Sequence, residues 1–222
     1  MLDNATTDYG ATLHVTDLAD DGVDDLIVGA PLFSSGQLEE GALHVIFGGA
    51  TGISSTSLQE VIEPNVIGAN LGAIIESGQF GADTRRDIVS TVNAGVLNQP
   101  VIYEDTGTGF GGGGTLLDAG GSVIQTLATG DANGDGVDDI LGANFGEGGL
   151  QPTGVVTLIT QDPGAPGTFS SPFNFSGAVG ESLGLDTGIA DLDGDSTPEL
   201  LLTTPNPLNA EPPSVHSFEL CL

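Results

Sequence analysis

Short apolar runs rich in β-branched residues recur along the chain, and glycine and aspartate bound each of them. Two clear examples are DLIVGA at 25–30 and VVTLI at 155–159. Apolar runs of this length between turn-forming residues are typical of buried β-strands. No helical periodicity accompanies them. The pattern therefore predicts an all-β protein with a core to bury, and it argues against a disordered chain.

One order of elements occurs four times: a strand, a nine-residue Asp-rich loop, a short apolar strand and a further β-rich run. The loops begin at residues 17, 79, 131 and 191, at spacings of 62, 52 and 60 residues. A repeat of this size with three or four strands per unit is typical of β-propeller blades. We expect a single domain over 1–222, with approximate blades at 7–63, 64–118, 119–176 and 177–222.

Weaker segments predict the outer strand of the first three blades, at about 57–63, 114–118 and 168–175. The last blade lacks such a segment, and residues 1–6 could supply its missing strand and close the ring. Closure of this kind would protect two sheet edges. Two alternatives remain open: a small closed ring of four blades, or part of a larger propeller.

The loop DANGDGVDD at 131–139 has the spacing of a metal-binding turn. Oxygen-bearing side chains occupy its positions 1, 3, 5 and 9, a glycine at position 6 permits a sharp bend, and position 7 offers a backbone carbonyl. A ligand set made only of oxygen atoms favours Ca²⁺, and the absence of His and Cys from all four loops argues against zinc. An EF-hand would need Glu at position 12, where the three intact loops carry Val28, Gly142 and Leu202.

The order of Tyr9-Gly10, the Asp-rich loop at 17–25, LIVGAP at 26–31 and the run that ends at residue 48 resembles the FG-GAP repeat of integrin α-subunit β-propellers. The resemblance covers nearly the whole chain at the level of blades, and the chain is similar to bacterial members found in large secreted or cell-surface proteins. It implies a calcium-bearing propeller with an extracellular or cell-surface location. It carries over no I-domain, partner subunit or ligand motif.

We expect three calcium sites, which differ in the completeness of their ligands. Blade one lacks a ligand at position 3, where Ala19 stands, so water or Asp20 would have to substitute and this site should be the weakest. Blade four carries Ser196 at position 6 in place of glycine. The predicted ligands, with Val23, Val137 and Thr197 acting through their carbonyls, are Asp17, Asp21, Val23, Asp25, Asp131, Asn133, Asp135, Val137, Asp139, Asp191, Asp193, Asp195, Thr197 and Glu199.

The loop of blade two, 79–87, is predicted to be free of metal. Gln79 and Gly81 replace the ligands at positions 1 and 3, and both basic residues of the chain, Arg85 and Arg86, lie inside it. We hypothesise that a guanidinium beside Asp83 or Asp87 takes the place of the cation.

The chain is strongly acidic, with 31 Asp and Glu against 2 Lys and Arg and a formal net charge of −29. Such a charge disfavours nucleic acids and anionic membrane surfaces as partners, because both are bound through basic side chains. No apolar run is long enough for membrane insertion, and no signal peptide is visible. The single cysteine, Cys221, excludes a disulfide within the chain.

Two catalytic patterns occur, but neither has the context that its chemistry needs. Residues 180–184 match G-x-S-x-G and residues 107–112 match G-x-G-x-x-G, yet no helix is expected after either. His14, His44 and His216 fall in predicted strands. We therefore expect no catalytic residues and a non-enzymatic binding or adhesion module for a protein or carbohydrate partner. The alternative is an accessory or catalytic domain of a secreted hydrolase or lyase that acts on polysaccharide.

Overall fold

The computed structural model describes residues 7–53, 59–93, 95, 97–110, 113–146, 153–205 and 213–220. Within these residues the fold is all-β, with four antiparallel sheets of three or four strands, and this confirms the predicted class of propeller-like blades. In the described part, no helix is long and apolar enough to cross a membrane. The chain divides into two compact units, 1–117 and 118–222.

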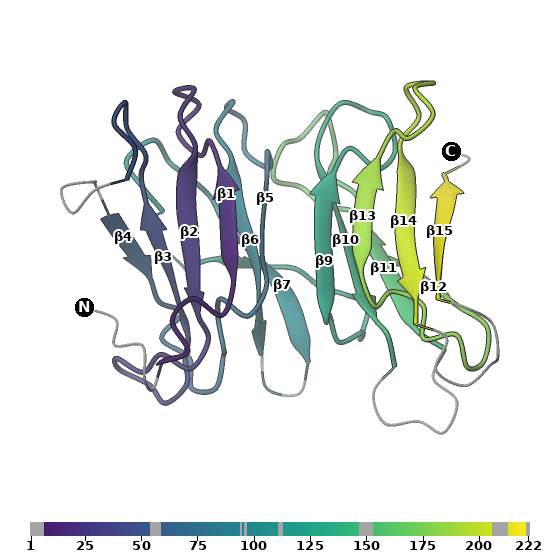
Figure 1. Ribbon diagram of the computed structural model, residues 1–222, viewed down its shortest axis with the longest axis horizontal. Coiled ribbons are helices and arrows are strands. Elements are labelled where there is room, and N and C mark those ends of the chain that lie inside the picture. The colour runs from purple at the N-terminus through teal and green to yellow at the C-terminus, as the bar shows by residue number, and fades with distance from the viewer. Residues whose placement is uncertain are drawn as a thin grey trace. The chain divides into compact units, whose positions relative to one another are not determined.

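The first unit contains two sheets whose strands follow one another in chain order (Figure 1). One comprises β1 (Leu13–Thr16), β2 (Asp25–Ala30), β3 (Ala42–Ile46) and β4 (Gln59–Ile62). The other comprises β5 (Ile75–Gly78), β6 (Asp87–Asn93), β7 (Asn98–Tyr103) and β8 (Thr115–Leu116). The outer strands β4 and β8 lie where the sequence predicted them.

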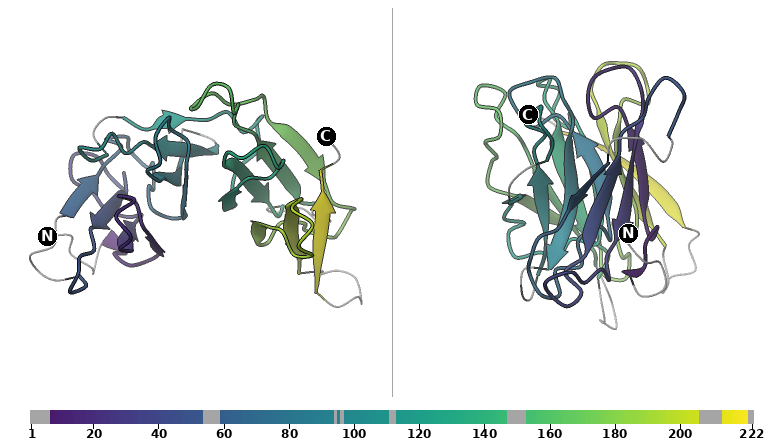
Figure 2. Two further views of the ribbon diagram at one scale, coloured as in Figure 1. Left: turned by 90° about the horizontal axis from the view of Figure 1, so that it is seen from above. Right: turned by 90° about the vertical axis from the view of Figure 1, so that its left-hand side faces the viewer.

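The second unit also contains two sheets in chain order. The four-stranded sheet comprises β9 (Thr126–Gly130), β10 (Asp139–Asn144), β11 (Val155–Ile159) and β12 (Phe173–Ser176). The three-stranded sheet comprises β13 (Thr187–Ala190), β14 (Glu199–Thr204) and β15 (Ser214–Glu219), the yellow strand in Figures 1 and 2. Residues 1–6, proposed from the sequence as a fourth strand for it, lie outside the described residues.

Each unit has its own hydrophobic core, built from the inward faces of its two sheets. In the first unit Ile27, Leu43 and Ile88 are fully buried and belong to one cluster. In the second unit Leu141, Val156 and Leu200 form the corresponding cluster. The second strand of each sheet is mostly buried, as the apolar runs of β2 and β10 predicted. These strands therefore provide rigid anchors for the loops that precede them.

Gly29 in β2 allows the two sheets of the first unit to approach closely. A Cβ built on Gly29 would lie 2.0 Å from the Gly72 carbonyl oxygen and 2.2 Å from Thr12 Oγ1. The Thr12 hydroxyl donates to that same carbonyl over 2.6 Å. Because backbone lies against backbone here, this position of the LIVGAP run requires glycine.

Candidate metal-binding loops

Each Asp-rich loop joins the first two strands of a sheet, and its ninth residue is the first residue of the second strand. Those ninth residues are Asp25, Asp87, Asp139 and Glu199. In Figure 1 the β1–β2 and β5–β6 loops lie at one end of the first unit, and the Thr84 hydroxyl of the second loop donates to Asp20 of the first over 2.7 Å. A strand therefore holds each end of every loop, and the strand that follows the loop is mostly buried.

The acid at position 1 organises the turn by accepting backbone amides from its own loop. Asp131 accepts from Gly134 and Asp135 through Oδ1, at 2.7 and 3.0 Å, and from Gly136 through Oδ2 at 2.8 Å. Asp17 and Asp191 accept the amides of Gly22 and Ser196 in the same way, at 2.7 and 2.9 Å. The three loops predicted to bind metal thus share one hydrogen-bonded scaffold.

Two left-handed residues, at loop positions 4 and 6, give these three loops their common backbone shape. The pairs are Asp20 and Gly22, Gly134 and Gly136, and Gly194 and Ser196, with φ values between 55° and 91°. The glycine pattern predicted the bend at position 6 but not the one at position 4. In the blade-two loop, whose residues are all described, neither Ala82 nor Thr84 adopts a positive φ.

The blade-four loop brings its acidic side chains together. Asp191, Asp193 and Asp195 each offer an oxygen within 4.8 Å of the others. Asp193, Glu199 and Glu219 form a second such group. Glu219 was missed by the sequence analysis, because it enters the site through its pairing with Glu199 across β14 and β15. A set of carboxylate oxygens at this spacing suits a hard divalent cation.

The blade-three loop repeats the hydrogen bonds of the blade-four loop, with an amide oxygen at position 3. Asn133 Oδ1 accepts the Asp135 amide at 2.9 Å, as Asp193 Oδ1 accepts the Asp195 amide at 3.1 Å. Asp135 in turn accepts the Val137 amide at 3.1 Å. Positions 1, 3 and 5 therefore present oxygen atoms from corresponding places in blades three and four.

The blade-one loop keeps the scaffold but lacks an oxygen from position 3. Asp17 and Asp21 occupy positions 1 and 5, and Asp21 accepts the Val23 amide at 2.9 Å. Asp20, considered from the sequence as a substitute ligand, instead accepts the hydroxyl of Thr84 in the neighbouring loop. At positions 1, 3, 5 and 9 the blade-one loop thus offers fewer side-chain oxygen atoms to a cation than the loops of blades three and four.

The acid at position 9 fastens the loop to the sheet. Asp139 accepts the Ala132 amide at 3.0 Å and the Gln161 amide, just beyond β11, at 2.8 Å. Asp25 accepts from Leu18 and Gly48 at 2.9 and 2.7 Å. In blade four Glu199 accepts the Leu192 amide at 2.8 Å. The closing acid therefore has a structural role in addition to the metal-ligating role predicted for it.

Burial raises the pKa of the closing aspartates of blades one, two and three. The pKa of Asp139 rises to about 7 because the carboxyl is desolvated, and the nearby Asp135 and Asp131 add to the shift against the two backbone amides. Burial likewise raises the pKa of Asp25 and Asp87. Each of these carboxylates carries a cost of desolvation that a nearby positive charge would reduce.

Blade two supplies a positive charge from the protein itself. Arg85 Nη1 lies 2.9 Å from Asp105 Oδ2. The Asp105 amide donates to Asp87 Oδ1 at 2.9 Å, and Phe80 and Gly81 donate to Asp87 Oδ2 at the same distance. The sequence-based hypothesis placed a guanidinium beside Asp83 or Asp87. In the structure the guanidinium of Arg85 pairs with Asp105, whose backbone amide donates to Asp87.

The three histidines lie on strands and contact hydroxyl groups. His14 Nε2 lies 2.9 Å from Ser77 Oγ, and His44 Nδ1 lies 2.8 Å from the Tyr9 hydroxyl. His216 lies 2.9 Å from Ser214 Oγ. Ser182, the serine of the G-x-S-x-G match, is buried with a φ of 50°, and β13 rather than a helix follows it.

Comparison with known proteins yields limited similarity. No family model matches the chain. Phosphatidylinositol-glycan-specific phospholipase D of Homo sapiens is 39% identical over 82 residues, which are 36% of this chain and 10% of that protein. The Mus musculus protein of the same name is 37% identical over 82 residues, with the same coverage. The matched region thus spans about one tenth of the length of these relatives. The similarity is confined to one segment of this all-β chain.

Proposed function

We propose that this chain is a calcium-stabilised, non-enzymatic β-propeller module of the FG-GAP type that binds a protein or carbohydrate partner outside the cell. The observation that carries the proposal is the convergence of Asp191, Asp193 and Asp195 on a loop whose backbone shape recurs in blades one and three. Carboxylate, amide and carbonyl oxygens are the ligands that Ca²⁺ prefers.

Electrostatics supports a structural role for the ions. Like charges about 4 Å apart repel by roughly 1–4 kcal/mol near a protein surface, and each of these loops concentrates several carboxylates. A bound Ca²⁺ would neutralise part of that charge and hold the loop between its two strands. At a free concentration of about 100 times Kd, one site would add roughly 2.7 kcal/mol to the free energy of unfolding.

Blade two supports a count of three ions. Its loop lacks the two left-handed residues and has no oxygen-bearing side chain at position 3, where Gly81 stands. Arg85 supplies a cation to the same hydrogen-bonded network. We therefore propose metal sites in blades one, three and four, with Glu219 as a further acidic group at the third of these.

Titration of the metal-free chain with CaCl₂ in a calorimeter tests the proposal. Saturable binding that approaches three equivalents, and that MgCl₂ does not reproduce, would support it. Absence of saturable binding, or equal binding of both cations, would contradict it, because the loops would then be acidic turns without selectivity.

A second candidate function rests on the similarity to a phospholipase D over 82 residues. The chain would then be an accessory or catalytic domain of a longer secreted hydrolase or lyase. Polysaccharides are the substrate class expected from the sequence for such an enzyme. A screen of the pure chain against polysaccharides and phosphatidylinositol glycans separates the two functions. Turnover would favour the enzyme, and binding without turnover would favour the module.

A further inference from the structure

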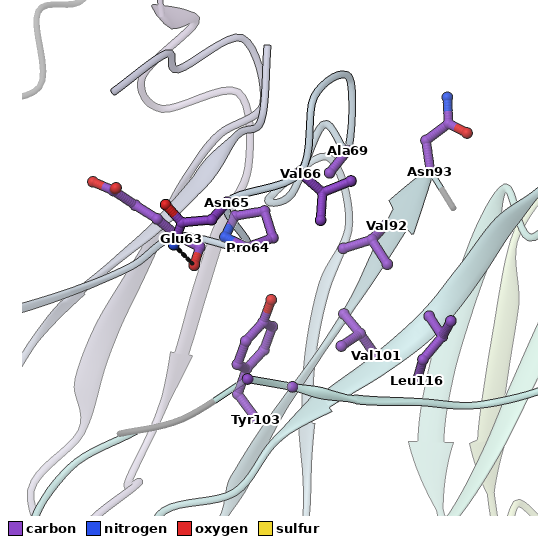
Figure 3. A pocket seen from close by; sticks show the side chains of 12 residues that line it. Glu63, Pro64, Asn65, Val66, Ala69, Val92, Asn93, Val101, Tyr103 and Leu116 are labelled. Atoms are coloured by element: carbon purple, nitrogen blue, oxygen red, sulfur yellow. Dashed lines mark hydrogen bonds between the residues drawn. The ribbon is translucent and has the colours of Figure 1, made fainter. Parts of the chain in front are cut away.

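A cavity of about 380 Å³ lies in the first unit, away from the metal-binding loops (Figure 3). Its walls come from the segment that follows β4 and from β6, β7 and the start of β8. Val66, Val92, Val101 and Leu116 line it with apolar side chains. Cavities of this size commonly hold small organic molecules.

Tyr103 places a polar group inside this apolar space. Its side chain is buried, with 4% of the residue exposed, and in Figure 3 the hydroxyl points toward the segment that carries Pro64 and Val66. Among the described residues the hydroxyl has no hydrogen-bond partner. Burial raises the pKa of Tyr103 to about 12, so the group stays a neutral donor at physiological pH. A ligand with an acceptor atom could therefore be recognised by this hydroxyl within an otherwise apolar space.

The wall opposite Tyr103 is held in place before any ligand binds. The amides of Gly68, Asn70 and Leu71 donate to the carbonyls of 38, 39 and 40, at 2.8, 3.1 and 3.1 Å. Glu40, itself buried, accepts the amides of Ser35, Gly36 and Gln37 through Oε1, which fixes that neighbouring loop. A preformed cavity avoids the ordering cost of ligand binding.

The charge of the protein restricts what can enter. The formal net charge is −29, and Glu63 lies at the cavity itself. An anionic ligand would be repelled by both, and the described lining residues include no cation to hold it. An uncharged, largely apolar molecule meets no such barrier.

We propose that this cavity is a binding site for a neutral, largely apolar small molecule that accepts a hydrogen bond from the Tyr103 hydroxyl. This proposal is independent of the metal-binding loops, because the residues that line the cavity belong to none of those loops.

Fluorescence titration of the full chain with Prodan, a neutral naphthalene ketone, tests the site. Saturable 1:1 binding with a blue-shifted emission is expected. The variant Val66→Trp should fill the mouth of the cavity and weaken binding about tenfold or more. The matched control is Ile67→Trp, because Ile67 is the exposed neighbour that does not line the cavity, and this variant should bind as the wild type does.

A second variant keeps the test independent of the behaviour of the tryptophan substitutions. Tyr103→Phe retains the ring but removes the donor, and it should weaken Prodan binding about fivefold. Absence of saturable binding, or equal affinity for the wild type and Val66→Trp, would overturn the site. Equal affinity for the wild type and Tyr103→Phe would overturn the assigned hydrogen bond.

Discussion

The guanidinium of Arg85 forms an ion pair with Asp105 at 2.9 Å, and the Asp105 amide donates to Asp87, the closing acid of the blade-two loop. In the other three loops the closing acid stands close to further carboxylates, at positions 1, 3 or 5. Blade two thus keeps the closing acid and Asp83 at position 5 but replaces the ligands at positions 1 and 3. The two parts of the loop motif have separable roles: position 9 fastens the loop, and positions 1, 3 and 5 concentrate charge.

Arg85→Gln should lower the thermal midpoint by a few degrees, equally in EDTA and in calcium, because it leaves the buried Asp105 carboxylate without its cation. Differential scanning calorimetry measures this. Arg86→Gln is the control, because Arg86 donates a longer hydrogen bond to a carbonyl, that of Ser77 at 3.3 Å, and its effect should be smaller. Unchanged midpoints for both variants would exclude an electrostatic role for Arg85.

Asp193→Asn should remove about one equivalent of bound Ca²⁺, since Asp193 belongs to both acidic groups of the blade-four loop. Calorimetric titration gives the stoichiometry. The matched control is Asp162→Asn, an exposed acid that also accepts a nearby amide, that of Gly164 at 2.8 Å, but lies outside the loops. Equal loss of binding in both variants would mean that general charge, rather than the loop, attracts the ion.

Ser196→Gly should raise the free energy of unfolding by about 0.5–1 kcal/mol, because Ser196 has a φ of 74°, where a side chain is strained. The reciprocal variant, Gly136→Ser, places a side chain at the equivalent position of blade three, where φ is 91°, and should lower it by about 1 kcal/mol. Urea denaturation measures both. Changes of the same sign would contradict the shared conformation of the two loops.

Asp139 should make the metal-free protein less stable as pH rises. Its folded-state pKa of about 7 lies above the ordinary value, so the unfolded chain releases this proton first. The contribution of the group is complete below about pH 4 and is lost as pH rises to about 7. Urea denaturation in EDTA between these values should show the decline in the wild type and a shallower one in Asp139→Asn. Parallel profiles would contradict the shift.

The strands were predictable because their apolar runs are continuous and glycine and aspartate mark their ends, as in β2 and β11. The second role of Asp139 was not predictable, since the amide of Gln161 that it accepts lies 22 residues away and is brought near by the pairing of β10 with β11. Glu219 was missed for the same reason. Spacing along the chain identifies residues within one loop, whereas strand register decides which distant residues join them.

Thermal unfolding of the chain in EDTA and in millimolar Ca²⁺, with Mg²⁺ as the control cation, tests the central claim most directly. The loops of blades one, three and four should then take up ions that bind the folded state alone, and the midpoint should rise by many degrees with Ca²⁺ but not with Mg²⁺. A chain that is folded in EDTA and shows the same midpoint in all three conditions would contradict calcium as a structural component of the blades.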